Sequence, residues 1–116
     1  MKDGFISVAA VTPQVKVADV TYNMVQSFEA IKQAAAEGAR VIVLPELGLT
    51  GYSCEDLFWQ DALLDASEQA LATLIEQTAQ LDALIMVGVP ACINAQLYNC
   101  AAVFCHGELL GLVPKK

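Results

Sequence analysis

Positive charge is scarce in this chain of 116 residues, which has six Lys and Arg against 13 Asp and Glu. The net charge of -7 argues against a nucleic-acid-binding protein, which would show a basic face, and against an anionic membrane surface. Charged residues make up only 16% of the chain and hydrophobic residues 56%. Such a sequence is neither disordered nor a charged tail, and it is more apolar than a self-contained soluble domain of this length usually is.

Long apolar runs are also missing. Leu84–Val89 and Ala101–Cys105 are among the longest, and both are far shorter than the roughly 20 residues that cross a bilayer. At the N-terminus, Asp3 and Gly4 stand where a signal peptide would begin its apolar core. We therefore expect a cytoplasmic protein with no membrane and no nucleic-acid partner.

The cysteines lack the C-x-x-C spacing that marks zinc and redox sites. Three of the four lie in or beside apolar stretches, where cysteine packs as a small hydrophobic residue. We expect reduced thiols rather than a disulfide framework or a metal site, in agreement with a reducing compartment. The four residues are Cys54, Cys92, Cys100 and Cys105.

Hydrophobic periodicity predicts two amphipathic helices. Apolar residues recur every three or four positions from Val17 to Ala35, and Gly38 follows as a helix stop. The same spacing returns from Leu64 to Leu81. Short apolar runs predict strands at Phe5–Val11, Val41–Leu44, Leu84–Val89, Leu97–Cys105 and Glu108–Val113.

The element order, which we write as β-α-β-α-β-β, predicts the α/β class, with helices laid on a sheet. Right-handed crossovers would put both helices on the same face of that sheet. The predicted strands carry apolar residues at consecutive positions, as parallel strands covered on both faces do. Because two helices cover one face, we expect more chain or another subunit to cover the second.

Catalytic groups of α/β sheets gather at the carboxyl ends of strands, and Glu46 follows one such end in Leu44-Pro45-Glu46-Leu47. Its apolar neighbours predict partial burial, which makes a carboxylate more basic. A general base that acts near neutral pH needs this property. The alternative is a structural Glu that caps a helical turn or pairs with an Arg, and position alone favours neither.

Lys115 also follows a predicted strand, where its ammonium could stabilise an oxyanion. The simpler interpretation is a solvated lysine. His106 is the only histidine, and it precedes Gly107 in a predicted two-residue hairpin turn, which favours a turn residue over a catalytic base. The sequence offers no Ser-His-Asp pattern, metal-ligand cluster or Gly-rich phosphate loop, so we expect no cofactor in this domain.

Two stretches resemble the nitrilase, or carbon–nitrogen hydrolase, superfamily. They are Leu44-Pro45-Glu46-Leu47 with Thr50-Gly51-Tyr52, and Gly111-Leu112-Val113-Pro114-Lys115. The extension that carries Glu55 and Asp56 is similar to the glutaminase domain of glutamine-dependent NAD synthetases, and Tyr98-Asn99 fits the same domain. The resemblance implies an α-β-β-α sandwich, in which a second sheet from the rest of the polypeptide packs on the uncovered face.

The resemblance also implies an activity: glutamine hydrolysis that supplies ammonia to a ligase, which amidates nicotinic acid adenine dinucleotide to NAD. Glu46 would take the proton of a cysteine thiol, Lys115 would stabilise the tetrahedral intermediate, and Tyr52 would form a wall of the glutamine pocket. ATP and Mg²⁺ would belong to the synthetase domain. The parent enzyme would be a homo-oligomer.

The nucleophilic cysteine of the family follows the lysine, whereas all four cysteines here precede Lys115. Residues 1–116 therefore resemble the N-terminal portion of a glutaminase domain without the nucleophile-bearing half and the synthetase domain. We expect this portion alone to be inactive. One alternative is another ω-amidase of the superfamily, which Glu55-Asp56 disfavours. The other is a non-catalytic, oligomer-forming fragment.

Overall fold

The structure is a computed structural model that describes residues 6–16, 19–45, 61–93 and 96–114. Its elements are β1 (Val8–Ala10), α1 (Val20–Ala36), β2 (Val41–Val43), α2 (Asp61–Gln77), β3 (Leu84–Ile93), β4 (Gln96–Cys105) and β5 (Glu108–Pro114). The predicted α/β class is confirmed. Three strands follow α2, so the order is β-α-β-α-β-β-β, one strand more than the expected order names. The first strand is also shorter than the predicted Phe5–Val11.

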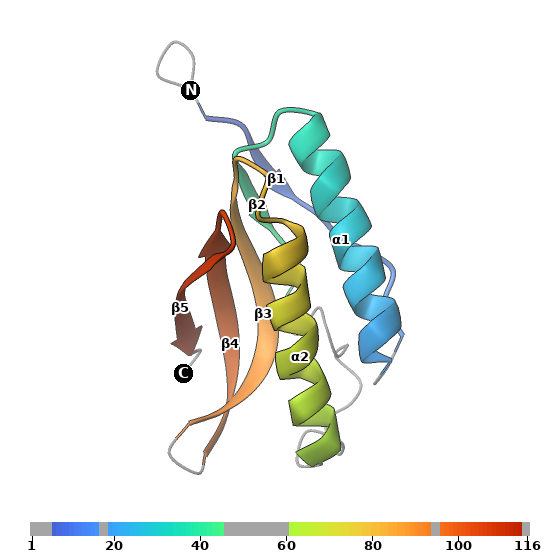
Figure 1. Ribbon diagram of the computed structural model, residues 1–116, viewed down its shortest axis with the longest axis vertical. Helices are drawn as coiled ribbons and strands as arrows, with labels where there is room; N and C mark the ends of the chain where they lie inside the picture. The colour runs from blue at the N-terminus through green and yellow to red at the C-terminus, as the bar shows by residue number, and fades with distance from the viewer. Residues whose placement is uncertain (1–5, 17–18, 46–60, 94–95, 115–116) are drawn as a thin grey trace.

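All five strands form one mixed sheet in the order β1-β2-β3-β4-β5. β1, β2 and β3 pair in parallel, and α1 and α2 are the crossovers between them (Figure 1). β4 and β5 add antiparallel strands. β5 therefore runs in the same direction as β1 to β3. The end of β2 and the end of β5 consequently lie at the same edge of the sheet, which we call the carboxyl edge.

Local chemistry sets both ends of α1. The Asp19 carboxylate accepts a hydrogen bond from the Tyr22 backbone N–H at 3.1 Å, which caps the first turn. At the other end Gly38 has a φ of +97°, which glycine adopts without strain. Its N–H donates to the Ala35 carbonyl, and the next N–H donates to the Ala34 carbonyl. This is the Schellman arrangement, and it confirms Gly38 as the helix stop.

Both helices lie on the same face of the sheet, as predicted (Figure 1). Alternate residues of the central strands point toward them and are fully buried, among them Ile42, Val87 and Phe104. The helices contribute Ile31 and Leu74, which are also fully buried. This covered face is the hydrophobic core of the described part of the chain.

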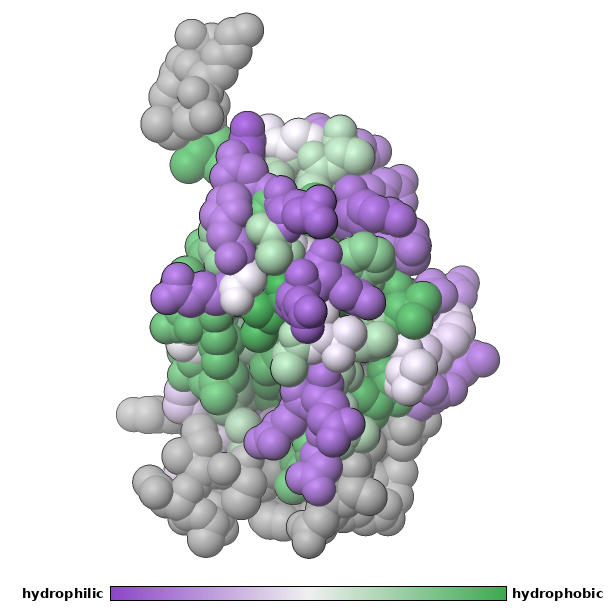
Figure 2. Space-filling view, in the orientation of Figure 1, coloured by the Kyte–Doolittle hydropathy of each residue, from purple (hydrophilic) through white to green (hydrophobic). Residues whose placement is uncertain are grey.

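The alternate residues of the same strands form the opposite side, which we call the open face. Its larger apolar residues include Val8, Val41, Val43, Leu84, Met86, Val103 and Val113. Val8 is 66% exposed and Val113 is 58% exposed, and the residues between them are half-buried. At the edge of the sheet, Figure 2 shows apolar side chains over β5, where Leu110 is exposed. Within the described ranges, no helix is both long and apolar enough to span a bilayer.

Candidate active site

The carboxyl edge is where the sequence places its catalytic candidates. β2 ends at Val43, three residues before Glu46, and β5 ends at Pro114, directly before Lys115. Glu46, Tyr52 and Lys115 themselves lie outside the described residues. The structure thus brings together the two strand ends that lead into Glu46 and Lys115, and the roles of these side chains remain predictions.

A hollow of about 310 Å³ lies at this edge. Its lining residues come from β3, β4 and the ends of β2 and β5: Val43, Leu44, Met86, Val87, Gly88, Asn99, Cys100, Ala101 and Val113. Leu44 stands two residues before Glu46, and Val113 stands two residues before Lys115. The lining residues are mostly apolar, and Asn99 is the polar residue among them. Apolar walls with few polar groups are typical of sites that bind small molecules.

Asn99 was not among the predicted site residues. The sequence signal that could have found it is the Tyr98-Asn99 pair, which gives no role to either side chain. Its position in the hollow follows from the pairing of β4 with β3, where Asn99 lies opposite Pro90. That pairing joins residues far apart in the chain, so sequence pattern alone does not reveal it.

Two of the four cysteines can be described in full, and both are free thiols. Cys100 is buried, and its burial raises the pKa of the thiol above the ordinary value. A raised pKa disfavours the reactive thiolate. Cys105, the last residue of β4, is half-buried. Cys54 lies outside the described residues, as does the side chain of Cys92.

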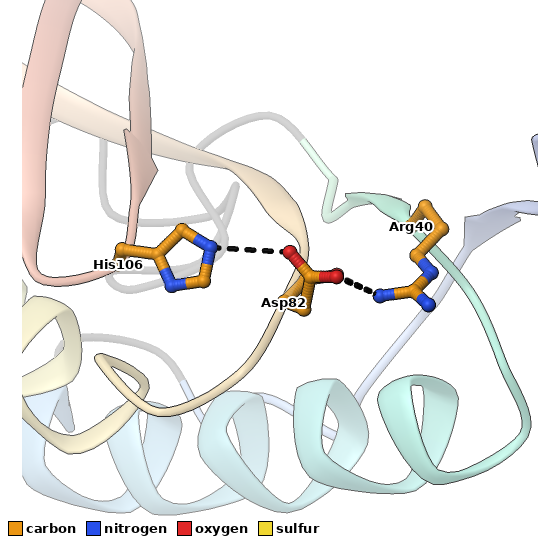
Figure 3. A network of polar contacts seen from close by, with 3 residues as sticks. All are labelled: Arg40, Asp82 and His106. Carbon is orange, nitrogen blue, oxygen red and sulfur yellow. Dashed lines mark hydrogen bonds and ion pairs between the residues drawn. The ribbon is translucent and has the colours of Figure 1, made fainter. Parts of the chain in front are cut away.

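His106 lies at the opposite edge of the sheet, in the turn between β4 and β5. His106 and Gly107 have φ angles of 51° and 79°, as a type I′ hairpin turn requires. The His106 Nε2 atom is 3.1 Å from an Asp82 carboxylate oxygen, and Arg40 bonds the other oxygen (Figure 3). Arg40 also donates to the Asp82 carbonyl. His106 is therefore a turn residue that helps to join three loops.

The fold and the carboxyl edge together define the class: an α/β domain whose candidate site lies beyond the strand ends. The sequence model of the carbon-nitrogen hydrolase family matches residues 7–115. The chain belongs to the carbon-nitrogen hydrolase family.

Curated relatives show which members of this family the chain resembles. The glutamine-dependent NAD(+) synthetase of Mycobacterium tuberculosis is 40% identical over 112 residues, which is 97% of this chain and 16% of the relative. The chain thus spans only a small part of the curated relatives it matches. The predicted resemblance to the N-terminal part of these synthetases is confirmed.

Comparison with solved structures leads to the same similarity. A glutamine-dependent NAD(+) synthetase from Cytophaga hutchinsonii superposes with a TM-score of 0.89 at 26% identity, covering 96% of this chain and 19% of that one. An amidase from Nesterenkonia sp. superposes with a TM-score of 0.76 at 19% identity, covering 95% of this chain and 42% of that one. At that identity, the amidase shows the shared fold alone.

Proposed function

We propose that this chain supplies the Glu- and Lys-bearing part of a glutaminase site, in an enzyme that makes NAD with glutamine as nitrogen donor. The observation that carries the proposal is the carboxyl edge. The ends of β2 and β5 line one apolar hollow, and in the sequence Glu46 and Lys115 follow these two ends by three residues and by one residue. The 40% identity to a glutamine-dependent NAD(+) synthetase supports glutamine as the substrate.

In this proposal a cysteine thiol gives its proton to Glu46 and attacks the side-chain amide carbon of glutamine. The C–N bond of the resulting tetrahedral intermediate breaks, the leaving nitrogen takes the proton from Glu46, and ammonia departs from a thioester. Water then hydrolyses the thioester. Lys115 stabilises the negative oxygen of the intermediate, because an ammonium in an apolar hollow is weakly screened. Tyr52 forms a wall of the glutamine pocket.

The nucleophile in this scheme follows Lys115 in the chain. It is therefore none of the four cysteines among residues 1–116, all of which precede Lys115. The raised pKa of the Cys100 thiol agrees with that assignment.

The rest of the polypeptide also contributes the second sheet, which packs on the open face, and the parent enzyme is a homo-oligomer. ATP and Mg²⁺ belong to the synthetase domain. Among the described residues, no group of three His, Cys, Asp or Glu side chains fits a metal ion.

The full-length protein with Glu46→Gln tests this function. Its glutamine-dependent NAD synthesis should be lost while its ammonia-dependent synthesis is kept, because only the base of the glutaminase reaction is removed. Glu68→Gln, a matched change at an exposed position of α2, should keep both activities. An equal fall of both activities in Glu46→Gln would show that Glu46 is structural, and a wild-type protein that does not hydrolyse glutamine would contradict the proposal.

A further inference from the structure

Asn23 is a fully buried polar residue near the start of α1. A buried amide costs free energy unless its donor and its acceptor are hydrogen-bonded. The Asn23 Oδ1 atom accepts a hydrogen bond from the Lys16 backbone N–H at 2.7 Å, and the Asn23 Nδ2 atom donates one to the Lys16 carbonyl at 2.9 Å. The side chain thus pairs with both polar groups of the Lys16 backbone, as a residue of a neighbouring antiparallel strand would.

Lys16 is the last residue of the stretch 11–16, which we call the β1–α1 segment. The segment begins at the carboxyl edge, because it follows β1, which is parallel to β2. Its first residue, Val11, donates its backbone N–H to the Val43 carbonyl at 2.9 Å. The segment is therefore held at both ends, by β2 at Val11 and by α1 at Lys16.

The Val11 end of the segment contacts the strand that leads into the hollow. Val43 is the last residue of β2, and both Val43 and Leu44 line the hollow. On the other side of β2, the Leu44 N–H donates to the Met86 carbonyl of β3 at 2.9 Å. The end of β2 is thus held from two sides, by β3 and by the β1–α1 segment, and Asn23 anchors the segment.

We propose that Asn23 is a positioning residue for the hollow: its amide holds Lys16, and the β1–α1 segment passes this constraint through Val11 to the end of β2. The inference rests on the proposed function, in which the hollow belongs to the glutaminase site. Asparagine suits the task because its planar amide presents one acceptor and one donor, which match the N–H and the carbonyl of Lys16. Leucine offers neither group, and an ionised carboxylate offers only acceptors.

Hydrogen exchange tests the anchor without reference to activity. The full-length protein with Asn23→Leu keeps the approximate size of the side chain and loses both hydrogen bonds. The Lys16 amide should then exchange about tenfold faster or more, because its acceptor is gone. The Val11 amide should also exchange faster, because the segment has lost its anchor on α1. Mass spectrometry with fragmentation that resolves single residues measures both rates.

Ser27→Ala is the matched control for exchange and for activity. Ser27 is also fully buried, one turn further along the same face of α1. Its hydroxyl makes no hydrogen bond to the residues that the structure describes. This change removes a buried polar group from the same helix without touching the β1–α1 segment, so both exchange rates and both activities should stay near wild type.

Kinetics of the same variants show whether the anchor serves the reaction. In Asn23→Leu the kcat/KM for glutamine hydrolysis should fall about tenfold or more, because a displacement of about 1 Å in a site can cost about a hundredfold in rate. Ammonia-dependent NAD synthesis should be kept, since the hollow takes no part in it. Asn23→Asp keeps the shape and an acceptor and loses only the donor. It should show the same pattern more weakly, and it replaces Asn23→Leu if that variant does not fold.

The outcomes separate this inference from the proposed function. An unchanged exchange rate at either amide overturns the anchor. Faster exchange with unchanged glutamine kinetics, or an equal fall of both activities in both variants, overturns the positioning role, while a selective loss of glutamine-dependent synthesis in Glu46→Gln would still support the proposed function. If the wild type hydrolyses no glutamine and Asn23→Leu speeds exchange at Val11 and Lys16, the hold of Asn23 on the end of β2 is supported and only the proposed reaction is overturned.

Discussion

The two faces of the sheet are built from the same strands and nearly the same residue types, yet their environments are opposite. In β2, Ile42 is fully buried under the helices, whereas its neighbours Val41 and Val43 are half-buried on the open face. Phe104 and Val103 of β4 show the same contrast. All these side chains are apolar, so hydrophobicity does not distinguish the faces. The comparison shows that one face of this sheet carries apolar side chains typical of a core, while no helix or strand of the described residues packs on it.

The largest expected effect concerns the open face as a whole. The chain of residues 1–116 alone should self-associate or bind a hydrophobic dye. Each 400 Å² of apolar surface left in water forfeits about 10 kcal/mol, at roughly 25 cal/mol per Å². That is comparable to the whole stability of a domain. Sedimentation at micromolar concentration measures the association, and the full-length protein is the control. A stable, compact monomer that binds no dye would contradict the need for cover.

Phe104 and Val103 are neighbours in β4 that lie on opposite faces, so their substitution compares the two faces within one strand. Phe104→Ala should lower the free energy of unfolding of the full-length protein by about 3 to 5 kcal/mol, because it leaves a cavity under the helices. Val103→Ala in the same protein should cost more than about 1 kcal/mol, because the proposed second sheet covers the open face. Urea unfolding measures both. A cost of about 1 kcal/mol or less for Val103→Ala would show that the open face stays exposed in the complete protein.

The helix stop before β2 should have a smaller effect. Gly38→Ala places a side chain at a φ of +97°, and we expect a loss of about 1 kcal/mol in the free energy of unfolding. The added methyl group meets nothing within 4 Å, so the loss would be conformational. Gly111→Ala is the control, because its φ is ordinary and its surroundings are also open. A tolerated Gly38→Ala would contradict the Schellman stop.

Cys100 and Cys105 of β4 lie on opposite faces, and the reactivity of their thiols compares the two faces. Cys105, half-buried on the open-face side, should react with iodoacetamide faster than buried Cys100. The raised pKa of the Cys100 thiol should also shift its labelling to higher pH, because the thiolate is the nucleophile. Mass spectrometry of peptides from pH 7 to pH 10 measures both rates. Equal rates at each pH would show that Cys100 is not protected by burial.

The smallest effect concerns the loops at the edge of the sheet opposite the carboxyl edge. Asp82→Asn removes the carboxylate that joins Arg40 to His106, but all three side chains are substantially exposed. Exposed ion pairs contribute about 1 kcal/mol or less and weaken in salt. Thermal unfolding at low and high salt checks this. A loss well above that range would show that the network in Figure 3 is central to the fold.

The sequence alone determined the local structure of this protein. Periodic apolar residues predicted both helices, Gly38 predicted the end of the first, and His106-Gly107 predicted the hairpin turn, because caps and turns depend on residues close in the chain. The motif around Glu46 and the one that ends at Lys115 also indicated the family, which the match over residues 7–115 confirms.

Only the tertiary structure decided which apolar side chains are buried. The strands are apolar on both faces, so no alternation distinguishes Ile42 from Val43 until the helices dock on one side. The tertiary structure likewise placed Asn99 in the hollow and joined Arg40, Asp82 and His106 across three loops. These relationships depend on strand register and on contacts between distant residues, such as the 42 positions that separate Arg40 from Asp82. Short-range sequence patterns do not predict these contacts, because the register is fixed only when the strands pair.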